Sequence, residues 1–279
     1  MNNIDQYNTI SLELCRKITE SYSSSFSVAT SLLSPKVSDA IVSVYAFVRI
    51  ADEVVDTWRP DKMDGYLGDL TLDLKRAIKS GFSTNPIVHC FAGVVKDYQI
   101  PSDLIDAFIK SMRMDIKKRK FSEQEYKNYI YGSAEAVGLM CLMIFVNGSK
   151  RKYNDLLPEA RALGSAFQKI NFLRDYSSDS SDLGRVYFPH SQPFKLDEES
   201  KNHIINDINN DLQIAKPAIQ KLPISSRYGV ELAYSYFAAL TKLMARTPAQ
   251  QIAGHRISLP KSTKAYILTR VKTKQRFTK

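Results

Sequence analysis

The chain has 279 residues, 44% of them hydrophobic, so it can bury a substantial core. Its formal net charge of +10 favours anionic partners, but its basic runs lack the aromatic interleaving and finger spacing of nucleic-acid modules, which argues against nucleic acid. No apolar run reaches the roughly 20 residues of a membrane span, and the N-terminus carries no secretory signal. We therefore expect a cytoplasmic protein.

Basic residues gather in three separate runs, at residues 117–120, 150–152 and 261–279. A solvated surface explains each run, and an anionic membrane surface is the alternative, which predicts peripheral contact with the inner membrane. The three cysteines, Cys15, Cys90 and Cys141, are odd in number and widely spaced. This pattern predicts free buried thiols in a reducing compartment rather than disulfides or a metal site.

Nearly every segment has the spacing of an amphipathic helix, which predicts an all-α protein. Helix starts are marked by a proline or a capping residue at four places: Ser34-Pro35, Pro101, Ser122 with Glu125, and Pro158. Gly81 is expected to end a helix that begins near residue 62, and the last of the four helices should run to about residue 178. Residues 179–200 have loop composition, and helices should resume near residue 202, after residue 223 and after residue 260. No repeat or composition shift marks a boundary, so we expect one domain over residues 1–279.

The helix expected over residues 45–58 has two chemically different faces. Its polar stripe, at i, i+4, i+7 and i+11, consists of Tyr45, Arg49, Asp52 and Asp56. The opposite face is broad and apolar, which is typical of a buried helix whose polar stripe lies against an interior space. By itself, the stripe is also consistent with a hydrogen-bonded polar seam.

A second helix repeats this pattern between residues 168 and 179. Its stripe consists of Gln168, Asn171, Asp175 and Asp179, opposite another apolar face. One aspartate pair four residues apart is usually solvated, but two pairs on apolar-backed helices favour a shared site. If the helices face each other, four carboxylates meet and require cations between them, for which Mg²⁺ is suited. Such a site could draw away a diphosphate leaving group, with Arg49, Arg174 and Arg185 as hydrogen-bond donors.

Five segments in order, at residues 22–27, 45–56, 129–138, 171–179 and 184–189, resemble the squalene and phytoene synthases. The resemblance implies an isoprenoid-synthase fold, a helical bundle around a central cavity. It implies Mg²⁺, with Mn²⁺ as a substitute, held by Asp52, Asp56, Asp175 and Asp179. The diphosphate end of the cavity would be lined by Ser23, Ser25, Tyr45, Arg49, Gln168, Asn171, Arg174, Arg185 and Arg256. Where the family often has a second Asp after Asp52, this chain has Glu53, another oxygen ligand.

The resemblance also assigns a catalytic role to Tyr129, whose hydroxyl and ring would steady a cation or steer proton loss. A core tyrosine with a satisfied hydroxyl is the alternative interpretation. The implied reaction joins two isoprenyl diphosphates head to head through a cyclopropylcarbinyl diphosphate. The motif sequences resemble those of phytoene synthases more than those of squalene synthases. This resemblance implies two geranylgeranyl diphosphates as substrates, phytoene as the product and no requirement for NADPH.

Two other functions stay open from the sequence. The first is a squalene or dehydrosqualene synthase that uses farnesyl diphosphate. The second is a non-catalytic assembly or binding protein, which would be expected to lose ligands from the aspartate motifs, whereas both pairs are intact here.

Overall fold

The computed structural model describes residues 2–57, 61–117, 120–181, 184–189 and 195–277. Within these ranges the regular elements are helices, and an isolated parallel β-bridge joins Lys120 and Val186. This confirms the all-α prediction. The elements are α1 (Asn3–Tyr22), α2 (Ser24–Thr30), α3 (Pro35–Thr57), α4 (Met63–Ser80), α5 (Pro86–Asp97), α6 (Ser102–Lys117), α7 (Glu123–Ile130), the π-helix η1 (Tyr131–Glu135), α8 (Ala136–Phe145), α9 (Lys150–Arg174), α10 (Tyr176–Ser181), α11 (Glu198–Ile219), α12 (Ile224–Arg246), α13 (Ala249–Gly254) and α14 (Lys261–Phe277).

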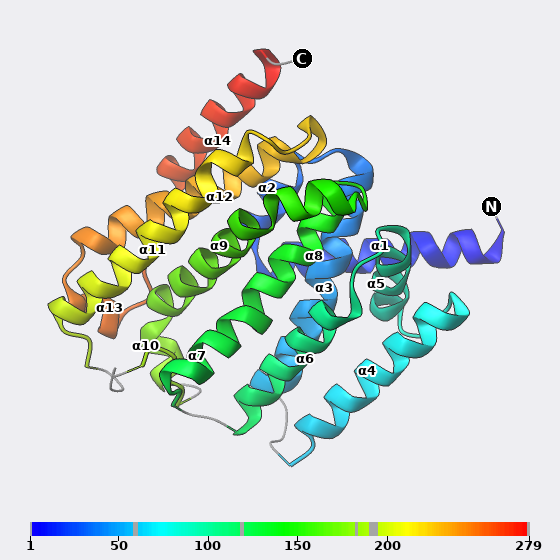
Figure 1. The fold of residues 1–279 in the computed structure, drawn as a ribbon, viewed down its shortest axis with the longest axis horizontal. Coiled ribbons are helices and arrows are strands. Elements are labelled where there is room, and N and C mark those ends of the chain that lie inside the picture. Colours follow the sequence, from blue (N-terminus) through cyan, green and yellow to red (C-terminus); the bar gives the residue numbers. More distant parts are fainter. Residues whose placement is uncertain (1, 58–60, 118–119, 182–183, 190–194, 278–279) are drawn as a thin grey trace.

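Helices α8, α9 and α11 run side by side through the body of the molecule (Figure 1), with α9 packed against both of the others. Helix α3 packs against α1, α5 and α8, and its buried residues belong to the largest hydrophobic cluster. Helices α4 and α5 lie on one side of this body, and α12 to α14 lie on the other (Figure 1). The two predicted acidic stripes therefore belong to central helices.

Most predicted helix boundaries are confirmed. Helix α3 begins at Pro35, α6 begins at Ser102, and the capping box of Ser122 and Glu125 opens α7. Gly81 ends α4 with φ of +81°, a left-handed conformation that glycine adopts without steric cost. The three cysteines are free, as expected, but only Cys15 is buried, whereas Cys90 and Cys141 are half-buried. Trp58, Lys118 and Arg119 were part of the sequence expectations but lie outside the described residues.

The predicted bounds of the second acidic helix were wrong at both ends. Pro158 lies inside α9, which begins at Lys150 after the N-cap residue Ser149. A proline inside a helix removes one backbone hydrogen bond, and the packing of α9 on α8 and α11 offsets that loss. Helix α9 also ends at Arg174, with Asp175 as its C-cap, so the second acidic stripe crosses a helix break. The Asp179 N–H still donates to the Asp175 carbonyl at 2.9 Å, which keeps the two residues one turn apart.

Helix α11 begins at Glu198, four residues before the expected start. The side chain of Asp197 accepts a hydrogen bond from the Ser200 N–H at 2.7 Å and so caps the extra turn. The π-helix η1 was not anticipated either. It places Gly132 so close to the neighbouring helix that a Cβ atom there would lie 2.4 Å from the Ala107 carbonyl oxygen. Only glycine permits this contact between η1 and α6.

One continuous helical run, from Glu123 to Phe145, is long and apolar enough to cross a membrane by length and composition. The sequence led us to expect no run of this kind, and this segment is an exception to that expectation. In the structure, 56% of its most apolar window is buried inside the protein. Its residues Leu139 and Met140 are almost completely enclosed by neighbouring helices, so the run forms part of the core.

Candidate active site

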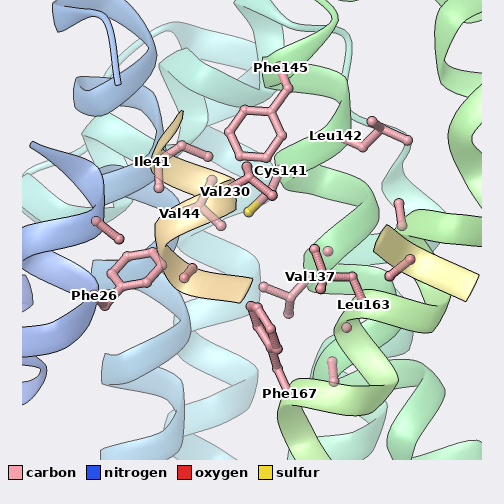
Figure 2. A pocket seen from close by; sticks show the side chains of 18 of the residues that line it. Phe26, Ile41, Val44, Val137, Cys141, Leu142, Phe145, Leu163, Phe167 and Val230 are labelled. Carbon is pink, nitrogen blue, oxygen red and sulfur yellow. The ribbon is translucent and has the colours of Figure 1, made fainter. Parts of the chain in front are cut away.

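An apolar cavity of about 270 Å³ lies between α2, α3, α8, α9 and α12. Figure 2 shows side chains from these helices pointing into it, among them Phe26, Val44, Val137, Leu163 and Phe167. The apolar faces predicted opposite the two acidic stripes contribute to this lining. The lining stretch of α9, from residue 156 to 168, is about 18 Å long at about 1.5 Å per residue, so the cavity is deep.

Among the polar lining residues, Tyr45 and Gln168 are those nearest in sequence to the acidic motifs. Both line the cavity; Tyr45 lies one helical turn before Arg49, and Gln168 lies about two turns before Asp175. Burial raises the pKa of Tyr45, so its hydroxyl stays protonated at the mouth of the cavity.

The first aspartate motif lies on the last turns of α3. The Arg49 guanidinium pairs with Asp52, at 2.7 Å between Nη1 and Oδ2, and also with Glu53. It stacks over the ring of Tyr22, 4.3 Å from the ring centroid. Arg49 is therefore held by two carboxylates and an aromatic face within hydrogen-bond reach of the first motif.

The second aspartate motif lies where α9 ends. Asp175 accepts from Arg174 Nε at 3.0 Å and from Arg256 Nε at 2.7 Å. The family resemblance predicted Arg256 at this end of the cavity. In the structure, its guanidinium contacts Asp175 directly. Asp179 follows on α10, one turn further along.

Arg185 joins the two motifs across the site. Its Nη1 atom lies 2.5 Å from Asp56 Oδ1, and its Nη2 atom donates to the Val55 carbonyl at 2.9 Å. Its backbone N–H donates to the Asp179 carbonyl at 2.9 Å. The side chain is only 4% exposed. The predicted approach of the two motifs is thus observed, with a buried arginine between them.

The carboxylates repel one another in this arrangement. Burial, reinforced by Asp56, raises the pKa of Asp52 to about 7. Burial, reinforced first by Asp175 and then by Asp56, raises the pKa of Asp179 to about 7. Asp56 of the first motif therefore acts on Asp179 of the second, and the site favours any cation that neutralises it.

This repulsion predicts a pH-dependent stability in the presence of a chelator. The native pKa values of Asp52 and Asp179 lie above the value of about 3.9 for an unfolded chain. Their contribution is fully present below about pH 4 and is lost as the pH rises to about 7, because the native state holds the extra protons. We expect urea denaturation to show a smaller decrease in unfolding free energy between pH 5 and 8 for the Asp52→Asn/Asp179→Asn variant than for the unsubstituted protein. Equal slopes would contradict the proposed repulsion.

The oxygen donors of the site fit a hard divalent cation that is shared with phosphate. No group of three or more metal-binding side chains is preformed within the ranges that the structure describes. Mg²⁺ is typically held by one or two carboxylates together with substrate phosphates, so two facing pairs suffice. The buried Oδ1 atom of Asn171 has no hydrogen-bond partner among the described residues. It is a further oxygen available to a ligand.

Tyr129 is not among the residues that line the apolar cavity. Its hydroxyl donates to Asp115 Oδ2 at 2.6 Å, and its ring packs within an aromatic cluster with Phe121, Phe172 and Tyr187. This agrees with the alternative interpretation of a core tyrosine with a satisfied hydroxyl. Its catalytic role stays a prediction.

Sequence reasoning missed Asp115, which lies under the acidic site on α6. It is 1% exposed, accepts from Tyr187 at 3.2 Å, and lies 3.9 Å from Arg185 Nε. Burial raises its pKa to about 6, against the effect of Arg185. The sequence could have predicted this buried carboxylate, because Asp115 lies on the same face of α6 as the apolar residues Phe108 and Met112.

The two predicted serines lie at the start of α2. Ser23 is the N-cap and accepts from the Phe26 N–H at 3.3 Å. Ser25 accepts a hydrogen bond from Lys264 Nζ at 2.9 Å. Lys264 belongs to the C-terminal basic run, which sequence reasoning treated only as surface. The tertiary structure thus brings one residue of that run to the predicted diphosphate end.

Comparisons with known proteins agree with this geometry. The squalene/phytoene synthase family model matches residues 19–263. The chain is 28% identical over 264 residues to a phytoene synthase from Rhodobacter capsulatus, which covers 86% of this chain and 75% of that protein. It is 28% identical over 216 residues to a 15-cis-phytoene synthase from Synechocystis, covering 71% of this chain and 61% of that protein.

A solved dehydrosqualene synthase in complex with a ligand superimposes with a TM-score of 0.80 over 97% of this chain and 98% of that chain. At 20% identity, this likeness speaks for the fold alone. The expected isoprenoid-synthase architecture is thereby confirmed. Because the family model covers most of its residues, the chain belongs to the squalene/phytoene synthase family, a family of prenyltransferases.

Proposed function

We propose that this protein joins two geranylgeranyl diphosphates head to head and forms phytoene through a cyclopropylcarbinyl diphosphate. The observation that carries this proposal is a deep apolar cavity that leads, past Tyr45 and Gln168, to two facing aspartate motifs. The cavity suits a prenyl chain, and the charged end suits its diphosphate. Curated relatives named as phytoene synthases support the C20 substrate.

In this proposal, Asp52, Asp56, Asp175 and Asp179 hold Mg²⁺, or Mn²⁺ in its place. Held by these carboxylates, such an ion would supply the positive charge that neutralises a diphosphate leaving group. Arg49, Arg174 and Arg256 already pair with these motifs and can turn toward phosphate oxygens as donors. Arg185 keeps the two motifs at a fixed separation.

The cavity walls then act on the hydrocarbon. Side chains such as Val44, Leu163 and Phe167 exclude water, which would otherwise capture a carbocation. The faces of Phe26 and Tyr45, stacked with centroids 4.8 Å apart, present π-electron density beside the mouth. Phytoene forms by proton loss, so the proposal includes no requirement for NADPH.

Product analysis tests this function directly. Purified protein with Mg²⁺ is expected to convert C20 diphosphate into a C40 hydrocarbon with or without NADPH. The same protein is incubated with C15 diphosphate as the parallel reaction, and both products are identified by mass. A C30 product alone would replace the proposal with a squalene or dehydrosqualene synthase.

We also propose that the protein works in the cytoplasm and contacts the inner membrane peripherally. The net charge of +10 favours an anionic surface. A C40 hydrocarbon has almost no solubility in water, so its release requires an apolar acceptor. A bilayer provides both the charge and the acceptor.

A further inference from the structure

A second hollow, unconnected with the aspartate motifs, lies between α11, α12 and α14. Its volume is about 620 Å³. Figure 1 shows α14 running beside α12 and projecting beyond the rest of the bundle, with its C-terminal end far from α10. Nothing in the proposed reaction uses this groove.

The rim of the groove is strongly basic. Its charged lining consists of Lys216, Lys242, Arg270, Lys274 and one acid, Glu231. Lys274 pairs with Glu231 at 2.7 Å. The three other cations are exposed and have no carboxylate partner among the described residues. The rim therefore offers three uncompensated positive charges, which complement an anion.

The floor of the groove is apolar. It includes Leu212, Ile219, Ile267 and Val271, contributed by α11 and α14. A small hydrophilic anion would use only the rim, whereas an anionic amphiphile would use both the rim and the floor. This combination favours a lipid over inorganic phosphate.

Helix α14 also exposes two large aromatic side chains beside the groove. Tyr266 is 70% exposed and Phe277 is 88% exposed. With Arg270 they occupy positions i, i+4 and i+11, so the three share one outward stripe of the helix. Aromatic side chains next to arginine and lysine are the pattern of a helix that lies at a membrane interface.

We infer that the groove between α11, α12 and α14 is a docking site for anionic phospholipid, through which the protein lies on a bilayer. The lipid phosphate contacts Lys216, Lys242 and Arg270, and its acyl region lies over the apolar floor. Tyr266 and Phe277 enter the interfacial layer. This inference rests on the proposed membrane contact and gives it a location.

Vesicle sedimentation tests the inference on the full chain. The variant Lys216→Gln/Lys242→Gln/Arg270→Gln is compared with Lys150→Gln/Arg151→Gln/Lys152→Gln, which loses the same charge from another exposed run. With vesicles containing phosphatidylglycerol at low salt, we expect the groove variant to bind about 100-fold more weakly than the unsubstituted protein. The control variant should change only a few-fold. Vesicles of phosphatidylcholine alone should bind all three proteins weakly.

A second variant, Tyr266→Ala/Phe277→Ala, keeps every charge. It should lose the part of vesicle binding that persists at high salt, because that part comes from apolar insertion. Inorganic phosphate and soluble C20 diphosphate serve as competitors. Full displacement by either one would overturn the assignment to a bilayer lipid, as would equal losses in the groove and control variants. Self-association through this face without vesicle binding would overturn it too.

Turnover of detergent-dispersed C20 diphosphate is measured in parallel and should be unchanged in the groove variant. If turnover persists while vesicle binding is absent from the unsubstituted protein, the docking site fails and the proposed function stands. If vesicle binding is as expected but the unsubstituted protein shows no turnover, the docking site stands and the proposed function fails.

Discussion

Asp52→Asn and Asp175→Asn are each expected to lower kcat/KM for C20 diphosphate at least about 1000-fold. Each substitution removes one negative charge from a motif that is proposed to hold the metal ion, which in turn neutralises the diphosphate. Asn keeps the shape of the side chain, so the helical circular dichroism should not change. Initial rates of product formation at saturating Mg²⁺ measure the effect.

Asp155→Asn is the matched control, because Asp155 is an exposed aspartate on α9, the helix whose C-cap is Asp175. It should keep full activity. Activity retained in the two motif variants would contradict the metal and diphosphate site. No turnover by the unsubstituted protein, by contrast, would favour the alternative of a family member that binds without catalysis.

Arg185→Met is expected to lower the free energy of unfolding by about 3–5 kcal/mol at pH 8. The arginine is almost completely buried, and its loss leaves Asp56 and Asp115 without their cation. Methionine fills much of the same volume, so the loss is mainly electrostatic. Urea denaturation followed by circular dichroism gives the value.

Adding Asp115→Asn to Arg185→Met should recover part of the lost stability, because the second substitution removes a buried charge that the first one isolates. Arg16→Met is a suitable control, since its pairing with Asp39 is at the surface and should contribute less than about 1 kcal/mol. Strictly additive effects of the Arg185 and Asp115 substitutions would show that the two residues do not form one buried unit.

Local sequence rules predicted the helices well where a single residue dictates the backbone. Proline at the start of α3, glycine at the end of α4 and the capping box at Ser122 each act within one turn. The same rules failed at Pro158, because the packing of α9 on its neighbours outweighs the cost of one missing hydrogen bond. They also missed the helix break at Asp175.

The two acidic stripes are a property of the sequence, since residue spacing on a helix decides which side chains share a face. Spacing alone was therefore enough to propose Asp52, Asp56, Asp175 and Asp179 as one site. Their separation and their state of charge could not be predicted in this way, because these depend on burial and on Arg185, which reaches Asp56 across 129 residues of sequence. The position of Asp115 beneath them was likewise decided by packing.

For this protein, the sequence alone determined the helical class, the apolar faces and the positions of the two aspartate pairs, because all three follow from short-range periodicity. The tertiary structure decided that Arg185 links the two motifs, that Arg256 contacts Asp175 and Lys264 contacts Ser25, and that α14 forms a basic groove with α11 and α12. These features join residues far apart in the chain. Their energies depend on which charges are buried together, and only the folded packing determines that.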